Sequence, residues 1–149
     1  MSEAPNSRFV YVTFIRTTAQ KLWDALTDPA TMREYWFGMH GESDFKAGSP
    51  WRLLSSDGRT LGAGDVLESE PPRRLAFHWR SEYNEDHQAE GVSTCVFTLE
   101  PVNGAVKLTV DHSIGVEKSK MILGVSEGWP PILSNLKSLL ETGAIAYSR

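Results

Sequence analysis

Hydrophobic residues recur at every second position through the middle of the chain, which is typical of half-buried β-strands. In residues 73–81, Leu75, Phe77 and Trp79 share one face of the predicted strand, because successive side chains of a strand point to opposite sides. The same alternation, with β-branched and aromatic residues enriched, predicts a sheet. Its expected strands are 8–16, 40–46, 50–56, 60–70, 73–81, 92–101 and 105–113.

Turn signals separate these strands and indicate their direction. Asp57-Gly58 and Asn103-Gly104 are dipeptides that favour tight hairpin turns, and Pro71-Pro72 marks a further turn. Because such turns reverse the chain within a few residues, we expect successive strands to pair antiparallel. The apolar residues then gather on one face of the sheet, and that face needs a cover.

A period of three to four residues predicts helices at two places. Thr17 opens a capping box with Gln20, and the pair Asp28-Pro29 starts a second short helix. The closing stretch GWPPILSNLKSLLETG, residues 128–143, predicts a longer amphipathic helix with Pro130 and Pro131 in its first turn. The residues expected to face water are Asn135, Lys137, Ser138 and Glu141.

Two segments between these elements are expected to be loops. Residues 113–126 carry several apolar side chains, among them Met121, Ile122, Leu123 and Val125. A loop of this length in a compact domain tends to be functional or mobile. The segment either forms a lid over a pocket or completes the core, and we favour the lid. Residues 81–90 are acidic and predict a solvated hairpin loop. The long helix is then the only amphipathic cover for the sheet, so the chain is interpreted as one α+β domain over residues 1–149.

Composition and charge exclude several function classes. A net charge of −4 without a basic stripe argues against a nucleic-acid surface, and no apolar run approaches the roughly 18 residues that span a membrane. The single Cys95 cannot form an internal disulfide, and the N-terminal residues MSEAPNSR lack the apolar stretch of a secretory signal. We therefore expect a cytoplasmic protein with no nucleic-acid or membrane partner.

Candidate chemistry is sparse. His112 lies on the inward face of its strand by alternation and is either a core histidine held by a hydrogen bond or the polar anchor of a ligand. His40, His78 and His87 are interpreted as surface residues. The sequence has no metal-ligand spacing, nucleophile elbow or phosphate loop, so we expect no metal or cofactor and identify no catalytic residues.

Four stretches resemble the activator-of-heat-shock-protein-90-ATPase-like family, in the START-like, Bet v allergen-like and polyketide-cyclase-like superfamily. They are TTAQKLWDALTDPATMREYW, GAGDVLESEPPRRLAFHW, LTVDHSIG and GWPPILSNLKSLLETG, in that order along the chain. The resemblance implies a helix-grip fold, in which a seven-stranded antiparallel sheet wraps around the long C-terminal helix. It also implies a hydrophobic cavity beneath the sheet, and it agrees with the two short helices expected after the first strand.

Three functions remain open for such a cavity. The first is binding of a small apolar or amphipathic molecule, such as a lipid or a polyketide-like compound. The others are a cyclase- or hydratase-type enzyme using the same cavity and, from the family name alone, a chaperone-associated stress-response protein. The expected cavity lining is Trp36, Trp51, Leu53, Phe77, Trp79, Phe97, Val110, His112, Trp129, Leu133 and Leu136. We favour ligand binding by a monomer or homodimer, because only one ionisable side chain is expected inside the cavity.

Overall fold

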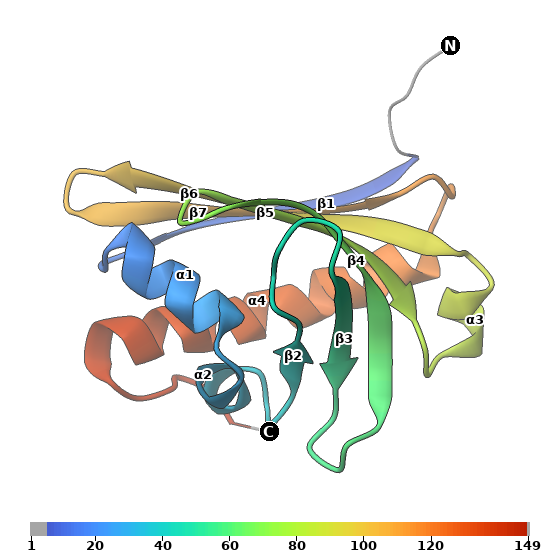
Figure 1. Cartoon of the computed structure of the whole chain (residues 1–149), viewed down its shortest axis with the longest axis horizontal. Helices are drawn as coiled ribbons and strands as arrows, with labels where there is room; N and C mark the ends of the chain where they lie inside the picture. Colours follow the sequence, from blue (N-terminus) through green and yellow to red (C-terminus); the bar gives the residue numbers. More distant parts are fainter. Residues whose placement is uncertain (1–5, 149) are drawn as a thin grey trace.

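Seven antiparallel strands form a single curved sheet in the order β1-β7-β6-β5-β4-β3-β2 (Figure 1). The strands are β1 (Ser7–Ile15), β2 (His40–Glu42), β3 (Pro50–Leu54), β4 (Thr60–Glu70), β5 (Arg74–Ser81), β6 (Val92–Val102) and β7 (Ala105–Ile114). The computed structural model describes residues 6–148. The sheet confirms the strands predicted from alternation, although β2 stops short of the expected residue 46, where Phe45 has a left-handed φ of 56°.

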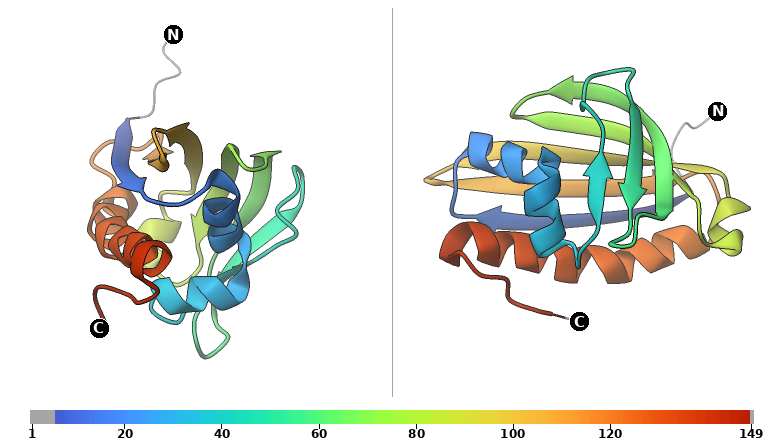
Figure 2. Two further views of the ribbon diagram at one scale, coloured as in Figure 1. Left: turned by 90° about the vertical axis from the view of Figure 1, so that its left-hand side faces the viewer. Right: turned by 60° about the horizontal axis from the view of Figure 1, so that its bottom comes forward.

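The helices all pack from one side of this sheet. They are α1 (Ala19–Thr27), α2 (Pro29–Tyr35), the one-turn α3 (Glu85–Gln88) and the long α4 (Lys120–Thr142). Helix α4 extends along the length of the sheet, and α1 and α2 close the same side (Figure 2). This arrangement confirms the expected α+β helix-grip fold.

Local signals explain where the first two helices begin. Asp28 Oδ2 accepts a hydrogen bond from the backbone N–H of Thr31 at 3.0 Å, and Pro29 occupies the first turn of α2. The carboxylate satisfies a donor that a helix start leaves free, and proline needs no acceptor there. The predicted start of α2 is therefore confirmed, whereas α1 is capped by Thr18, one residue after the expected Thr17.

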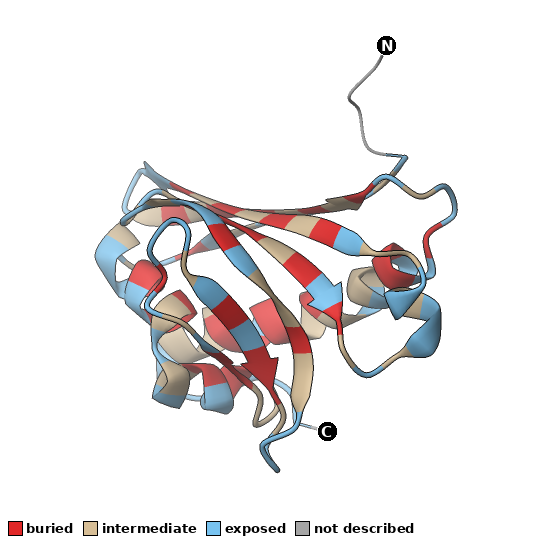
Figure 3. Cartoon of the chain, turned by 45° about the vertical axis from the view of Figure 1, so that its right-hand side comes forward, coloured by how far each residue is buried: buried red, intermediate tan, exposed pale blue. Residues whose placement is uncertain are grey.

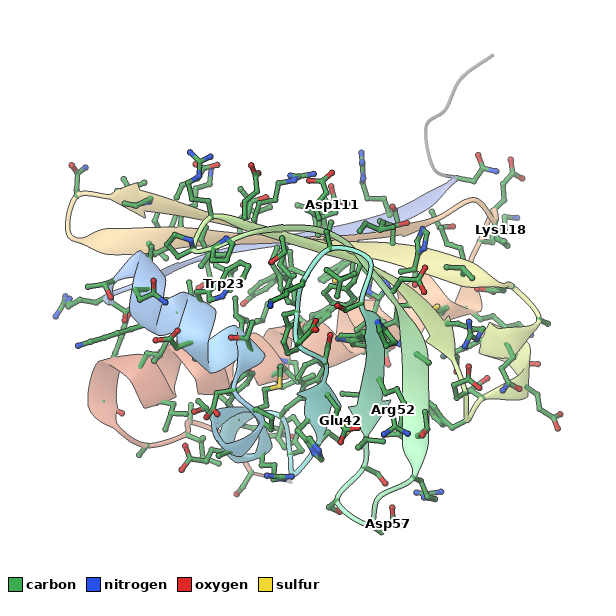
Figure 4. The ribbon with its side chains drawn as sticks, viewed as in Figure 1. Trp23, Glu42, Arg52, Asp57, Asp111 and Lys118 are labelled. Carbon is green, nitrogen blue, oxygen red and sulfur yellow. The ribbon has the colours of Figure 1, made fainter. Side chains whose placement is uncertain are left out.

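The strands divide an apolar inner face from a polar outer face. Buried residues alternate with intermediate or exposed ones along most of β6 and all of β7 (Figure 3), and β5 departs from this pattern only at the buried Ala76. Asp111 on β7 points away from α4 into solvent (Figure 4), where its carboxylate is 3.0 Å from Nε of Arg8. The neighbouring His112 points inward and is fully buried. The inner face of the sheet, α1, α2 and α4 together form one hydrophobic core.

Helix α4 begins earlier than the sequence pattern predicted. It starts at Lys120, so the second half of the expected 113–126 lid is helical, and Pro130 and Pro131 lie in the helix interior. The two prolines remove the N–H donors that would bond the carbonyls of Ser126 and Glu127. Those residues are half-buried and exposed respectively, so water can satisfy the carbonyls and the helix continues.

A carboxylate from the acidic segment caps this early helix start. Glu90 accepts hydrogen bonds from Ser119 Oγ (2.6 Å) and from the backbone N–H groups of Lys120 (2.7 Å) and Met121 (3.2 Å). Partial burial acts to raise the pKa of Glu90, but these three donors hold it below its ordinary value. The expectation of a fully solvated loop at 81–90 is therefore wrong, because its last carboxylate is bound to the N-terminus of α4.

Asn135 is also buried rather than facing water. Its Oδ1 accepts from the backbone N–H groups of Ala146 (3.0 Å) and Tyr147 (2.8 Å), and its Nδ2 donates to the Tyr147 carbonyl at 2.8 Å. The chain after α4 turns back beside the helix (Figure 2) and supplies these partners. Backbone groups therefore satisfy the buried amide in place of water. Helical periodicity alone does not reveal these partners.

The centre of α4 allows a direct test of close packing. Leu136 is fully buried and lies away from the pocket described below, so Leu136→Ala should lower the free energy of unfolding by ~2–5 kcal/mol. Urea denaturation measures this loss, with the exposed Ser134→Ala on the same helix as the control. A loss of less than about 1 kcal/mol would mean that Leu136 borders an open cavity.

Candidate ligand-binding pocket

A pocket of about 250 Å³ lies between the first half of α4 and the sheet strands β3 to β5. One stripe of α4 forms one wall: Met121, Gly124, Val125, Gly128, Trp129 and Ile132. The opposite wall comes from the end of α2 and from the strands: Trp36, Met39, Leu53, Leu61 and Trp79. All of these side chains are apolar or aromatic, as in small-molecule sites generally.

Three tryptophans form the aromatic part of this lining. The ring of Trp129 lies 5.4 Å from that of Trp36 and 5.9 Å from that of Trp79, the latter contact being edge-to-face at 88°. A Cβ atom at Gly62 would come within 2.6 Å of Trp79 Nε1, so the absence of a side chain there admits the indole. Mutual edge and tilted contacts keep the rings in fixed positions.

Two glycines of α4 leave space in the helix wall. A Cβ atom built at Gly128 meets no other atom within 4 Å, and one at Gly124 would lie 3.2 Å from Cε1 of His87. Glycine lowers helix stability relative to alanine. At Gly128 the missing side chain leaves open volume, and at Gly124 it allows His87 to approach the helix. The sequence pattern missed Gly124, which precedes the predicted start of the helix, and it placed Gly128 only at that start rather than in the helix interior.

The polar lining of the pocket comes from one stretch of the chain, at the end of β5 and in α3. Ser81, Tyr83 and His87 all border the volume, and no Lys, Arg, Asp or Glu among the described residues does. The sequence predicts His87 at the surface, whereas in the structure its half-buried side chain also borders the pocket. Only a contact between α3 and α4 brings it there, and no sequence periodicity indicates that contact.

His112 lies in the core behind the pocket, where protein groups use both of its ring nitrogens. Trp129 Nε1 donates to His112 Nδ1 at 3.2 Å, so the proton is on Nε2, which donates to Ser93 Oγ at 2.8 Å. The Ser93 hydroxyl in turn donates to the Trp79 carbonyl at 2.8 Å. This chain links α4 to three neighbouring strands, and it leaves His112 no free nitrogen for a ligand.

The expected cavity lining thus divides into two groups. Trp36, Leu53, Trp79 and Trp129 border the pocket. The others are buried in the surrounding core: Trp51, Phe77, Phe97, Val110, His112, Leu133 and Leu136. Strand alternation identifies inward-facing side chains but not those next to empty volume; Trp51, for example, stacks on Phe77 at 4.8 Å and fills its own space.

A curved antiparallel sheet that holds a long C-terminal helix defines the helix-grip class of folds. The chain belongs to the activator of Hsp90 ATPase homolog 1-like family, whose model matches residues 16–141. No curated protein sequence matches the chain.

Solved structures share this fold. CalU16 from Micromonospora echinospora aligns with a TM-score of 0.73 at 22% identity, over 91% of this chain and 77% of that protein. The Aha1 dimer from Colwellia psychrerythraea gives 0.74 at 19% identity, over 92% and 98%. DynU16, assigned to the dynemicin biosynthetic locus, gives 0.76 at 26% identity, over 95% of this chain and 49% of that one.

Two further features bear on partners. None of the helices within residues 6–148 is long and apolar enough to cross a membrane. In the same part of the chain, no three His, Cys, Asp or Glu side chains gather closely enough to hold a metal ion.

The buried imidazole gives a pH-dependent prediction. Burial lowers the pKa of His112 from 6.5 to about 3, so the unfolded chain binds this proton first as the pH falls. The stability that a neutral His112 provides is complete above pH 6.5 and decreases by about 1.4 kcal/mol per pH unit toward pH 3. His112→Gln keeps one donor and one acceptor but does not titrate. The unfolding free energy of this variant, measured by urea denaturation between pH 6.5 and pH 3, should therefore fall less steeply than that of the wild type. Parallel curves for the two proteins would contradict the burial.

Proposed function

We propose that this protein binds a small, largely aromatic molecule in the pocket between α4 and strands β3 to β5. The observation that carries the proposal is the open volume beside Gly128, bordered by three tryptophans. Protein interiors normally close such gaps, and a wall of aromatic rings with a few polar groups is typical of ligand sites.

The volume of the pocket limits the size of the ligand. A pocket of about 250 Å³ lies just below the usual ~300–1,000 Å³ of small-molecule sites, so a ligand of two or three fused rings suits it better than a long lipid chain. The likeness to DynU16, a protein of a biosynthetic locus, supports a polyketide-like compound over a membrane lipid.

A second candidate function is catalysis in the same pocket. Tyr83 and His87 both border the volume, so two ionisable side chains meet a bound molecule, where the sequence indicated only one. A cyclase or hydratase of this kind would use the imidazole as general acid or base. A chaperone-associated role is supported by the family description and by the fold shared with the Aha1 dimer. The choice between monomer and homodimer remains a prediction.

Filling the pocket tests the binding proposal. Gly128→Phe places a ring in the open space, so saturable binding of the fluorescent probe 1-aminoanthracene should be lost, whereas the wild type binds it. Phenylalanine has a higher helix propensity than glycine, so the unfolding free energy should not fall. Urea denaturation of the variant then shows that unfolding is not the cause of the lost binding.

Ser134→Phe is the matched control, because it adds the same ring to an exposed position of α4. Equal binding by the wild type and Gly128→Phe would place the probe elsewhere and refute the proposal. Trp129→Ala would be a less direct test of the pocket, because it removes the hydrogen-bond donor to His112 Nδ1 and so also disturbs the core.

A further inference from the structure

The pocket is polar at one end only, and the end of β5 with the α3 region supplies that polarity. Ser81, Tyr83 and His87 lie within seven residues of one another along the chain, whereas the rest of the lining is apolar. A ligand bound here has its ring system against the tryptophans and its one polar group toward α3.

His87 has the hydrogen-bonding capacity to meet that group. Within residues 6–148 neither its ring nitrogens nor the Tyr83 hydroxyl makes a hydrogen bond. Ser81 Oγ is partly used, because it accepts from the backbone N–H of Asn84 at 3.4 Å. A neutral imidazole offers one donor and one acceptor, so it suits a hydroxyl or a carbonyl equally well.

The imidazole is held in place before any ligand arrives. The backbone N–H of His87 donates to Asn84 Oδ1 at 3.1 Å, and the ring rests against Gly124 of α4. Beyond α3, Glu90 fastens the segment to the start of α4, and Asp86 lies 3.5 Å from Lys120 Nζ. A preorganised polar group costs less ordering entropy on binding.

Charge around this end disfavours a carboxylate. Residues 81–91 carry four acidic side chains and no Lys or Arg. Two cations that flank this segment are already paired with carboxylates: Arg80 with Glu82 at 2.6 Å and Lys120 with Asp86 at 3.5 Å. The four carboxylates repel a further negative charge at this end of the pocket.

From this geometry we infer that His87 is the polar anchor of the pocket and that its ligand is an uncharged aromatic compound bearing a hydroxyl or carbonyl group. The inference rests on the proposed function and narrows it, because it excludes fatty acids and other carboxylates. It also moves the anchor from His112, the residue that strand alternation indicated, to a residue on α3.

Three probes of similar shape test it: 2-naphthol, 2-methylnaphthalene and 2-naphthoate, each titrated by calorimetry. The wild type should bind 2-naphthol roughly 2- to 12-fold more tightly than 2-methylnaphthalene, as one neutral hydrogen bond provides, and 2-naphthoate most weakly. His87→Phe keeps a ring of similar size and should remove the preference for 2-naphthol, leaving 2-methylnaphthalene binding intact.

Two further variants control the comparison. His78→Phe changes a histidine on the outer face of β5, near Asp65, and should leave all three affinities unchanged. Gly124→Ala brings a methyl group within 3.2 Å of the imidazole, so it should shift the ring and reduce the 2-naphthol preference without removing the pocket.

The outcomes separate the two proposals. If no probe binds saturably, the proposed function itself fails. If 2-naphthol and 2-methylnaphthalene bind equally, or His87→Phe keeps the preference, the pocket stands and the anchor is wrong. Tightest binding of 2-naphthoate overturns the exclusion of carboxylates.

Discussion

The hydrogen bond from the Trp129 indole to the His112 imidazole determines how α4 lies on the sheet. Both side chains are almost completely buried, and an indole donor has only this one hydrogen to satisfy. Because His112 in turn binds Ser93, and Ser93 the Trp79 carbonyl, the rotation of α4 about its axis is tied to three strands. Loss of any member would leave a buried polar group unpaired, which is costly in a low-dielectric core.

That fixed rotation also explains the pocket. With Trp129 directed at His112, the neighbouring stripe of α4 that contains Gly124 and Gly128 faces β3 to β5, and the absence of side chains there leaves volume. Trp79 and Trp129 belong at once to the core and to the pocket wall, so the wall cannot collapse into the gap without disturbing the core. Glu90 keeps the polar end of the pocket in place, because it joins the α3 region to the start of α4.

Local chemistry made most of the fold predictable from the sequence. Asn103 and Gly104 both have positive φ, as their hairpin signal requires, and Asp28-Pro29 starts α2 as expected. Prediction failed where a distant residue decides the outcome. The start of α4 depends on Glu90, some thirty positions earlier in the chain, and His87 reaches the pocket only through a contact with Gly124. Alternation gave the inward direction of His112 but not its partners.

The five tryptophans of the chain test directly whether an aromatic molecule binds in this pocket. Each gives an indole N–H resonance in a two-dimensional ¹H–¹⁵N spectrum. Trp36, Trp79 and Trp129 border the pocket, whereas Trp23 lies on α1, away from it (Figure 4). Titration with 2-naphthol should shift the first three resonances along one saturable curve and leave that of Trp23 in place. Shifts of Trp23 alone, or equal small shifts of all five, would show that the aromatic molecule binds outside this pocket.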